Sequence, residues 1–113
     1  MKRDMDIVRN ILLTFERDGE YEVMDAIEAG HVAIMIDAGL VDAKVATDGN
    51  GQPIAAMIFR ITWSGHDFLD NARSPEIWDK AKKAISEKAA SVSIDILTAL
   101  LKKLAADSLG VAL

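Results

Sequence analysis

The sequence predicts an α+β fold in one domain of 113 residues, and two changes of pattern along the chain support this prediction. Apolar residues recur at helical spacing up to residue 38 and again after residue 62, whereas a β-prone stretch with turn residues lies between them. A chain of this length has room for one modest core, and its apolar share of 50% is ordinary for a globular protein.

Two helices are predicted in the first third of the chain. The first spans residues 4–17 and stops at Asp18-Gly19. The second spans residues 23–37 and ends at Gly39, because a glycine readily adopts the left-handed conformation that ends a helix. The helical spacing is carried by Met5, Val8, Ile11, Leu12 and Phe15 in the first helix, and by Val23, Ile27, Ile34 and Ala38 in the second.

A β-hairpin is predicted next, from the β-prone residues 44–47 and 54–61. The intervening loop contains Asp-Gly and Asn-Gly, which tolerate positive φ. A calcium loop starting at Asp48 would need Glu at its twelfth position, where Phe59 stands, so a turn is the favoured interpretation.

Three further helices are predicted after the hairpin. The first is capped either by Thr62 or by a box of Ser64 and Asp67, and the second begins at Ser74-Pro75. A break at Ser91–Ser93 precedes the last helix. Trp63 and Trp78 are expected to pack in the core or at its edge.

This order of elements resembles that of winged-helix regulators, in which a hairpin forms the wing. The matching residues are Asp37-Ala38-Gly39-Leu40-Val41 and Ile61-Thr62-Trp63-Ser64-Gly65. Between Gly19 and Val23, however, there is no room for the helix that normally precedes the recognition helix. Residues 20–30 are therefore expected to form a shortened version of that helix, or the helix is omitted.

Over nearly its full length the chain is similar to a bacterial and phage family, domain of unknown function 2513. The resemblance is carried by the opening Met1–Arg9, by Ala38-Gly39-Leu40 and by Thr62–Asp70, and Ile77-Trp78 and Ser93–Leu97 fit as well. It implies a single winged-helix-like domain, with residues 1–73 as the core and 74–113 as a C-terminal helical extension. It also implies a phage or prophage context, but no activity.

The distribution of charge bears most directly on function. The net charge is −5, and eleven acidic but three basic residues lie between Asp4 and Asn50. The predicted recognition helix carries Asp25, Glu28, His31 and Asp37 but no Lys or Arg. Protein surfaces that bind DNA usually need these basic residues.

Two binding functions therefore remain open. A DNA-binding transcriptional regulator would contact nucleic acid through Lys2, Arg3, His31, Lys44 and Arg60. Alternatively, a protein-interaction module, acting as a nucleic-acid mimic or an inhibitor, would dock an acidic face on a basic host or phage protein. That face would consist of Glu20, Glu22, Asp25 and Glu28.

An enzyme is not expected, and no catalytic residue, cofactor or metal is assigned. The chain has no cysteine, its two histidines lack zinc spacing, and His66-Asp67 has no nucleophile beside it and is better explained as a helix start. The charged N-terminus and the absence of a long apolar run predict a cytoplasmic protein without a membrane segment.

The last helix carries an apolar seam of Ile94, Leu97, Leu101 and Leu104. This seam either closes the core of its own chain or pairs two copies in a homodimer, and its width alone does not decide between them.

Overall fold

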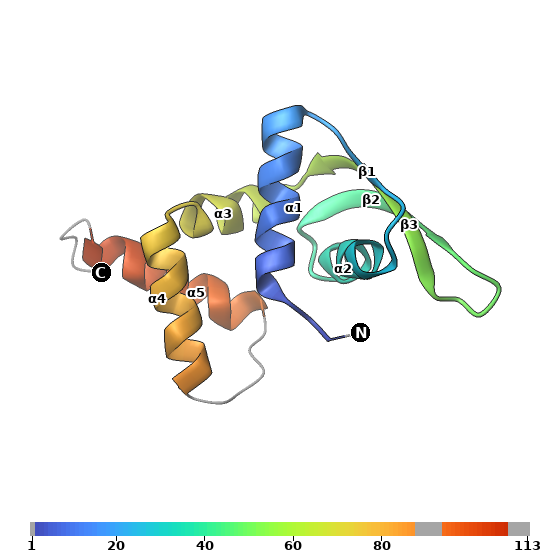
Figure 1. Ribbon diagram of the computed structural model, residues 1–113. Coiled ribbons are helices and arrows are strands. Elements are labelled where there is room, and N and C mark those ends of the chain that lie inside the picture. Colours follow the sequence, from blue (N-terminus) through green and yellow to red (C-terminus); the bar gives the residue numbers. More distant parts are fainter. Residues whose placement is uncertain (1, 88–93, 109–113) are drawn as a thin grey trace. The chain divides into compact units, whose positions relative to one another are not determined.

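The computed structural model describes residues 2–87 and 94–108 and divides into two compact units, Met1–Leu69 and Asp70–Leu113. The α+β class is confirmed, because helices accompany a three-stranded antiparallel sheet (Figure 1). The division lies within helix α3 (Trp63–Ala72), a few residues before the boundary at 73/74 that the sequence predicts. None of the described helices is long and apolar enough to cross a membrane.

Helix α1 (Met5–Asp18) confirms the first predicted helix. The Asp4 carboxylate accepts a hydrogen bond from the Asp6 N–H at its start. At its end Gly19 adopts a φ of 74° and its N–H donates to the Phe15 carbonyl. The buried residues of this helix are Val8, Ile11 and Leu12.

The start of the second predicted helix is wrong, because Tyr21–Val23 forms the strand β1. Tyr21 pairs with Ile58 and Val23 with Ala56, which are contacts that local periodicity does not reveal. Helix α2 (Ala26–Asp37) begins only after Asp25, whose carboxylate accepts from the Glu28 N–H at 2.9 Å. Residues 20–30 therefore supply a strand and the first turns of α2, and no shortened helix precedes α2.

The predicted hairpin is confirmed as β2 (Val41–Thr47) and β3 (Pro53–Ile61), and the sheet order is β1–β3–β2. The loop is a turn, as expected. The Asp48 carboxylate accepts from the Asn50 and Gln52 N–H groups, and Gly51 adopts a φ of 79°.

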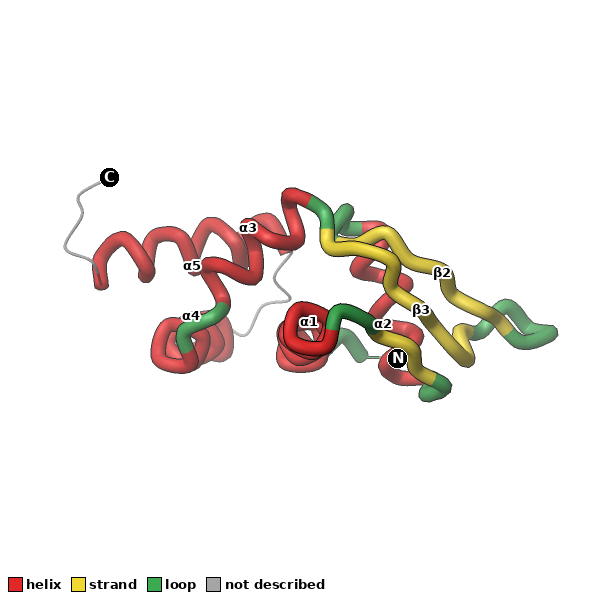
Figure 2. Tube along the Cα trace, turned by 90° about the horizontal axis from the view of Figure 1, so that it is seen from above, coloured by secondary structure: helices red, strands yellow, loops and turns green. Residues whose placement is uncertain are grey.

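The core of the first unit lies between the sheet and α2, which rests on one face of it (Figure 2). Buried Ala56 and Ile58 of β3 point to this inner face, together with Val32 and Met35 of α2 on the other side. The opposite, outer face of the sheet carries exposed side chains, namely Glu22, Lys44, Met57 and Phe59.

The end of α2 and the start of α3 are joined by the two motifs that carry the family resemblance. At the end of α2, the Leu40 N–H donates to the Met35 carbonyl and Gly39 adopts a φ of 75°. The Thr62 N–H donates to the Leu40 carbonyl, and its hydroxyl donates to the Gly39 carbonyl. The same hydroxyl accepts from the Gly65 N–H, so Thr62 is the N-cap of α3.

The two tryptophans differ from each other. Trp78 is buried, as expected, but Trp63 is 88% exposed, so its expected packing in the core is wrong. Trp63 is the first residue of α3, and the side of this helix that is buried begins with Gly65, Phe68 and Leu69.

The second unit contains α4 (Pro75–Glu87) and α5 (Ile94–Ser108), which contact each other. The Ser74 hydroxyl accepts from the Ile77 N–H at the start of α4, as predicted. Leu97 and Leu101 of the predicted oligomer seam are fully buried within the chain, so they are not available to a second copy. Ile94 and Leu104 are half-buried. The predicted break at Ser91–Ser93 lies outside the described residues.

Candidate functional site

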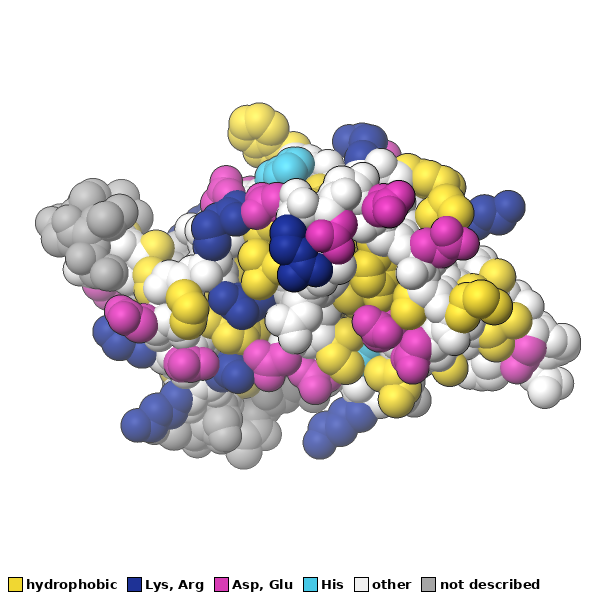
Figure 3. Space-filling view, turned by 45° about the horizontal axis from the view of Figure 1, so that its top comes forward, with side chains coloured by type: hydrophobic (Ala, Val, Ile, Leu, Met, Phe, Trp, Pro, Cys, Tyr) yellow, Lys and Arg dark blue, Asp and Glu magenta, His cyan; other side chains and the backbone are white. Residues whose placement is uncertain are grey.

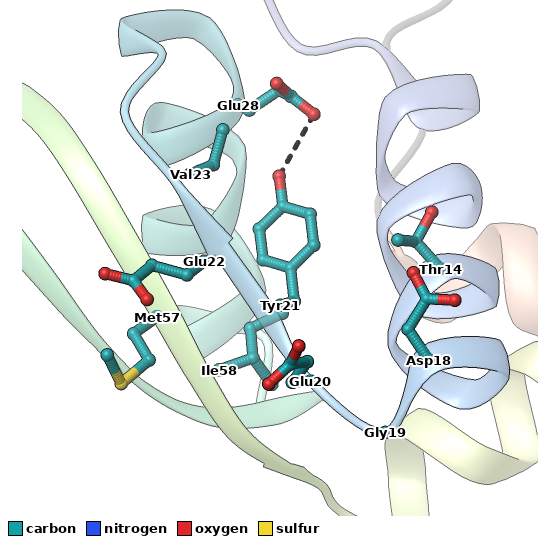
Figure 4. A pocket seen from close by; sticks show the side chains of 10 residues that line it. All are labelled: Thr14, Asp18, Gly19, Glu20, Tyr21, Glu22, Val23, Glu28, Met57 and Ile58. Atoms are coloured by element: carbon teal, nitrogen blue, oxygen red, sulfur yellow. Dashed lines mark hydrogen bonds between the residues drawn. The ribbon is translucent and has the colours of Figure 1, made fainter.

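A hollow of about 520 Å³ lies beside β1, between the end of α1 and the first turn of α2 (Figure 4). Four of its lining residues are carboxylates, namely Asp18, Glu20, Glu22 and Glu28. The ten described residues that line it include no Lys or Arg. On the face drawn in Figure 3, acidic side chains lie among hydrophobic ones over α2 and the sheet.

The hollow extends around an edge strand. Among the described strands β1 pairs only with β3, so its other edge has no strand partner. Successive side chains of a strand point to opposite faces. Tyr21 accordingly points towards α1, whereas Glu22 lies on the other side of the strand with Met57 (Figure 4).

Tyr21 and Glu28 are linked at the wall of the hollow. The Tyr21 hydroxyl donates to Glu28 Oε1 at 3.0 Å. Burial raises the pKa of the Tyr21 phenol well above its ordinary value, and the hydrogen bond to Glu28 and the charges of Glu28 and Asp25 raise it further. The phenol therefore stays neutral, while the second oxygen of Glu28 is left to accept from another donor.

Asp18 is an acidic residue of this hollow that the sequence did not indicate, because Asp18-Gly19 was interpreted only as a helix stop. Arg17 Nε lies 2.8 Å from Asp18 Oδ1. This hydrogen bond lowers the pKa of the Asp18 carboxyl; desolvation opposes the shift, and the guanidinium charge adds a lesser lowering. The repeated acidic residues between 16 and 22 were the signal that could have included Asp18.

The predicted acidic docking residues are brought together in part. Glu20, Glu22 and Glu28 line the hollow, whereas Asp25 does not. The Asp25 carboxylate caps α2, which gives this residue a structural role, and its role in docking stays a prediction.

The predicted nucleic-acid contacts are not brought together, and His31 is corrected most clearly. His31 is fully buried. Its Nε2 accepts from the Asp4 N–H at 2.9 Å, and its Nδ1 lies 2.7 Å from the Ile27 carbonyl. The Nδ1–H tautomer satisfies both bonds, so the ring joins the N-terminal segment to α2 and cannot reach a base.

The four basic candidates are all exposed but dispersed. Lys2 and Arg3 precede α1, Lys44 lies on the outer face of the sheet, and Arg60 forms an ion pair with Asp42. The exposed residues of α2 are Ala26, Ile27, Ile36 and Asp37, none of which donates a hydrogen bond to a guanine edge.

Neither a metal cluster nor a catalytic histidine is present among the described residues. Among the described residues, no group of three or more His, Asp or Glu side chains is arranged to hold a metal ion. His66 is exposed in the first turns of α3, where its N–H donates to the Thr62 carbonyl. The hollow beside β1 is therefore the candidate site. Its carboxylates are of the kind that form ion pairs and accept hydrogen bonds from basic groups.

The motifs at Ala38–Leu40 and Thr62–Gly65 join α2 to α3, and both motifs lie within the part of the chain that a known family model matches. Residues 2–91 match the family model described as "Hypothetical protein (DUF2513)". The chain belongs to the DUF2513 family. A relative from Haemophilus influenzae, described as "Uncharacterized protein", is 29% identical in an alignment over 107 residues; the alignment covers 86% of this chain and 89% of the relative. No solved structure matches this DUF2513 chain significantly.

Proposed function

We propose that this protein is a binding module that captures a Lys- or Arg-rich segment of a partner protein in the acidic hollow beside β1. The observation that carries the proposal is the convergence of Asp18, Glu20, Glu22 and Glu28 on one concave surface. A hollow lined by charges of one sign concentrates ligands of the opposite sign and steers their approach.

The neighbouring strand supports the same function. Because the edge of β1 has no partner among the described strands, an extended basic segment could lie along it with its side chains among the carboxylates. Tyr21 lies in the wall of the same hollow, and a cation near the Tyr21–Glu28 pair would favour the ionised phenol.

The experiment measures binding of a fluorescent oligolysine peptide of about ten residues at low and at physiological ionic strength. The test variant is Glu20→Lys/Glu22→Lys, since neither residue caps a helix. The control is Asp37→Lys/Asp107→Lys, which makes the same change of net charge. Both residues are exposed at the C-terminal ends of helices, where a basic side chain is favourable.

Each charge reversal removes an attraction of about 0.2–1 kcal/mol and adds a repulsion of about the same size. The test variant should therefore bind about fivefold to several hundredfold more weakly than the wild type. The control should keep most of its affinity. Equal losses in both variants, or no binding by the wild type at low salt, would contradict the proposal.

DNA binding is the second candidate, supported by the topology. The element order α1, β1, α2, β2, β3 and the sheet order β1–β3–β2 resemble those of a winged helix without its second helix, and this resemblance supports DNA binding. Salt-sensitive binding of a DNA duplex that is lost on Lys2→Glu/Arg3→Glu would favour this candidate. The acidic and apolar exposed surface of α2 is the reason that we place it second.

A further inference from the structure

The outer face of the sheet carries two rows of side chains whose order is set by the strand register. Met57 of β3 pairs with Glu22 of β1 on one side and with Lys44 of β2 on the other. One row further along, Ala55 pairs with Ala46. Val23 of β1 pairs with Ala56, so Met24, the next residue, lies level with Ala55 in that second row.

The charges in the first row have no ionic partner among the residues that the structure describes. Glu22 and Lys44 lie on strands that flank β3, which separates their backbones by about 10 Å. Neither side chain forms an ion pair with another described residue. Both are exposed, one on each side of Met57.

The apolar side chains of this face are also left in solvent. Met24 is 88% exposed, Phe59 58% and Met57 41%. Beside them lies a hollow of about 240 Å³, and Ala46, Ala55 and Lys44 are among the residues that line it. Large exposed side chains next to a hollow floored by alanines are typical of a surface that a partner covers.

We propose that the partner is a second copy of this chain, packed face to face about a two-fold axis that runs parallel to β3 through Met57. This axis carries β1 of each copy over β2 of the other. Glu22 then faces the partner's Lys44, and the same pair forms again on the other side of the axis. Met57 meets its own counterpart in the centre.

The same operation matches the second row. It places each exposed Met24 over the partner's Ala46, next to the hollow, so that a long flexible side chain meets a small one. A two-fold axis across the strands would instead place Glu22 on Glu22 and Lys44 on Lys44. The row of Glu22 and Lys44 therefore favours the axis parallel to β3.

The size of the face sets the strength of the association. Three strands and the nine residues of β3 make a face of about 14 by 30 Å, or roughly 400 Å². This is about half of the roughly 800 Å² per partner that stable complexes bury. The dimer is accordingly weak and depends on protein concentration.

Sedimentation of the full chain at concentrations up to about 1 mM tests the proposal. The wild type should dimerise, and Glu22→Lys or Lys44→Glu alone should weaken the dimer about tenfold or more, because each change places like charges together at two sites. The double variant Glu22→Lys/Lys44→Glu should restore it. Lys83→Glu, an exposed charge reversal on α4, is the matched control.

Three results would overturn the proposal. They are a monomer at every concentration, a dimer that both single reversals leave unchanged, and a double variant no stronger than the single ones. A dimer through another surface would give the second result. Circular dichroism confirms that each variant is folded. Since no peptide is present in this experiment, its outcome is independent of binding in the acidic hollow.

Discussion

The contact between the two family motifs leads to a sharp prediction about Gly65. A Cβ added at this position would lie 2.0 Å from the Leu40 carbonyl oxygen and 2.6 Å from Cγ2 of Ile61. The carbonyl cannot easily move, because it accepts from the Thr62 N–H and belongs to the turn that ends α2. Gly65→Ala therefore forces a backbone shift at the junction of α2 and α3.

The magnitude follows from two opposing effects. Alanine is favoured over glycine inside a helix by about 1 kcal/mol. Overpacking a well-packed site costs about 1–3 kcal/mol. Because the clash is with backbone, the cost lies at the upper end of this range, and we expect Gly65→Ala to lower the free energy of unfolding by about 2 kcal/mol. This is a substantial part of the 5–15 kcal/mol typical of a domain.

Urea denaturation followed by far-ultraviolet circular dichroism measures this loss. Gly49→Ala is the control, because a Cβ at Gly49 meets nothing within 4 Å. The control should stay within about 0.5 kcal/mol of the wild type. If Gly65→Ala were as stable as Gly49→Ala, the motifs would not be in the contact described, and a role for them in binding would have to be considered instead.

Three further predictions concern the site and its supports. Tyr21 is the one tyrosine of the chain, so the phenolate absorbance reports on it alone. In the folded protein its pKa should lie above the ordinary value of 10.0. Glu28→Gln should lower this pKa without restoring the ordinary value, because burial is the main cause of the shift. Because the folded pKa is raised, the stability that this phenol contributes is complete below pH 10 and is lost as the pH rises towards the folded pKa, which urea denaturation at alkaline pH measures. His31→Leu replaces a buried side chain that accepts from the part-buried Asp4 N–H, and it should cost about 2–3 kcal/mol in urea denaturation. His66→Leu at an exposed position should cost less than about 0.5 kcal/mol, and equal losses would refute the buried role of His31. Asp48→Ala removes two hydrogen bonds in the hairpin loop and should lower stability by about 1 kcal/mol, and an unchanged denaturation midpoint would show that this turn forms without the carboxylate.

The elements that could be predicted from the sequence are those whose signals are local. Gly19 ends α1, Gly39 follows the end of α2, and Ser74 caps α4, each within a few residues of the element that it bounds. The hairpin was equally visible, because its turn residues lie between two β-prone segments. These features depend on backbone conformation and on hydrogen bonds between near neighbours.

The elements that could not be predicted depend on distant partners. Tyr21–Val23 is a strand only because β3, more than thirty residues later, pairs with it. The same dependence explains the site. Asp18 joins the carboxylates of Glu20, Glu22 and Glu28 only after α1 and β1 have been brought beside the start of α2.

By itself, then, the sequence determined the α+β class, the family, most helix ends and the excess of negative charge, since all of these are read from composition or from neighbouring residues. Only the tertiary structure decided that His31 is buried, that Trp63 is exposed and that the acidic residues share one hollow. The reason is physical: burial and proximity are properties of packed surfaces, and packing is settled between elements rather than within them.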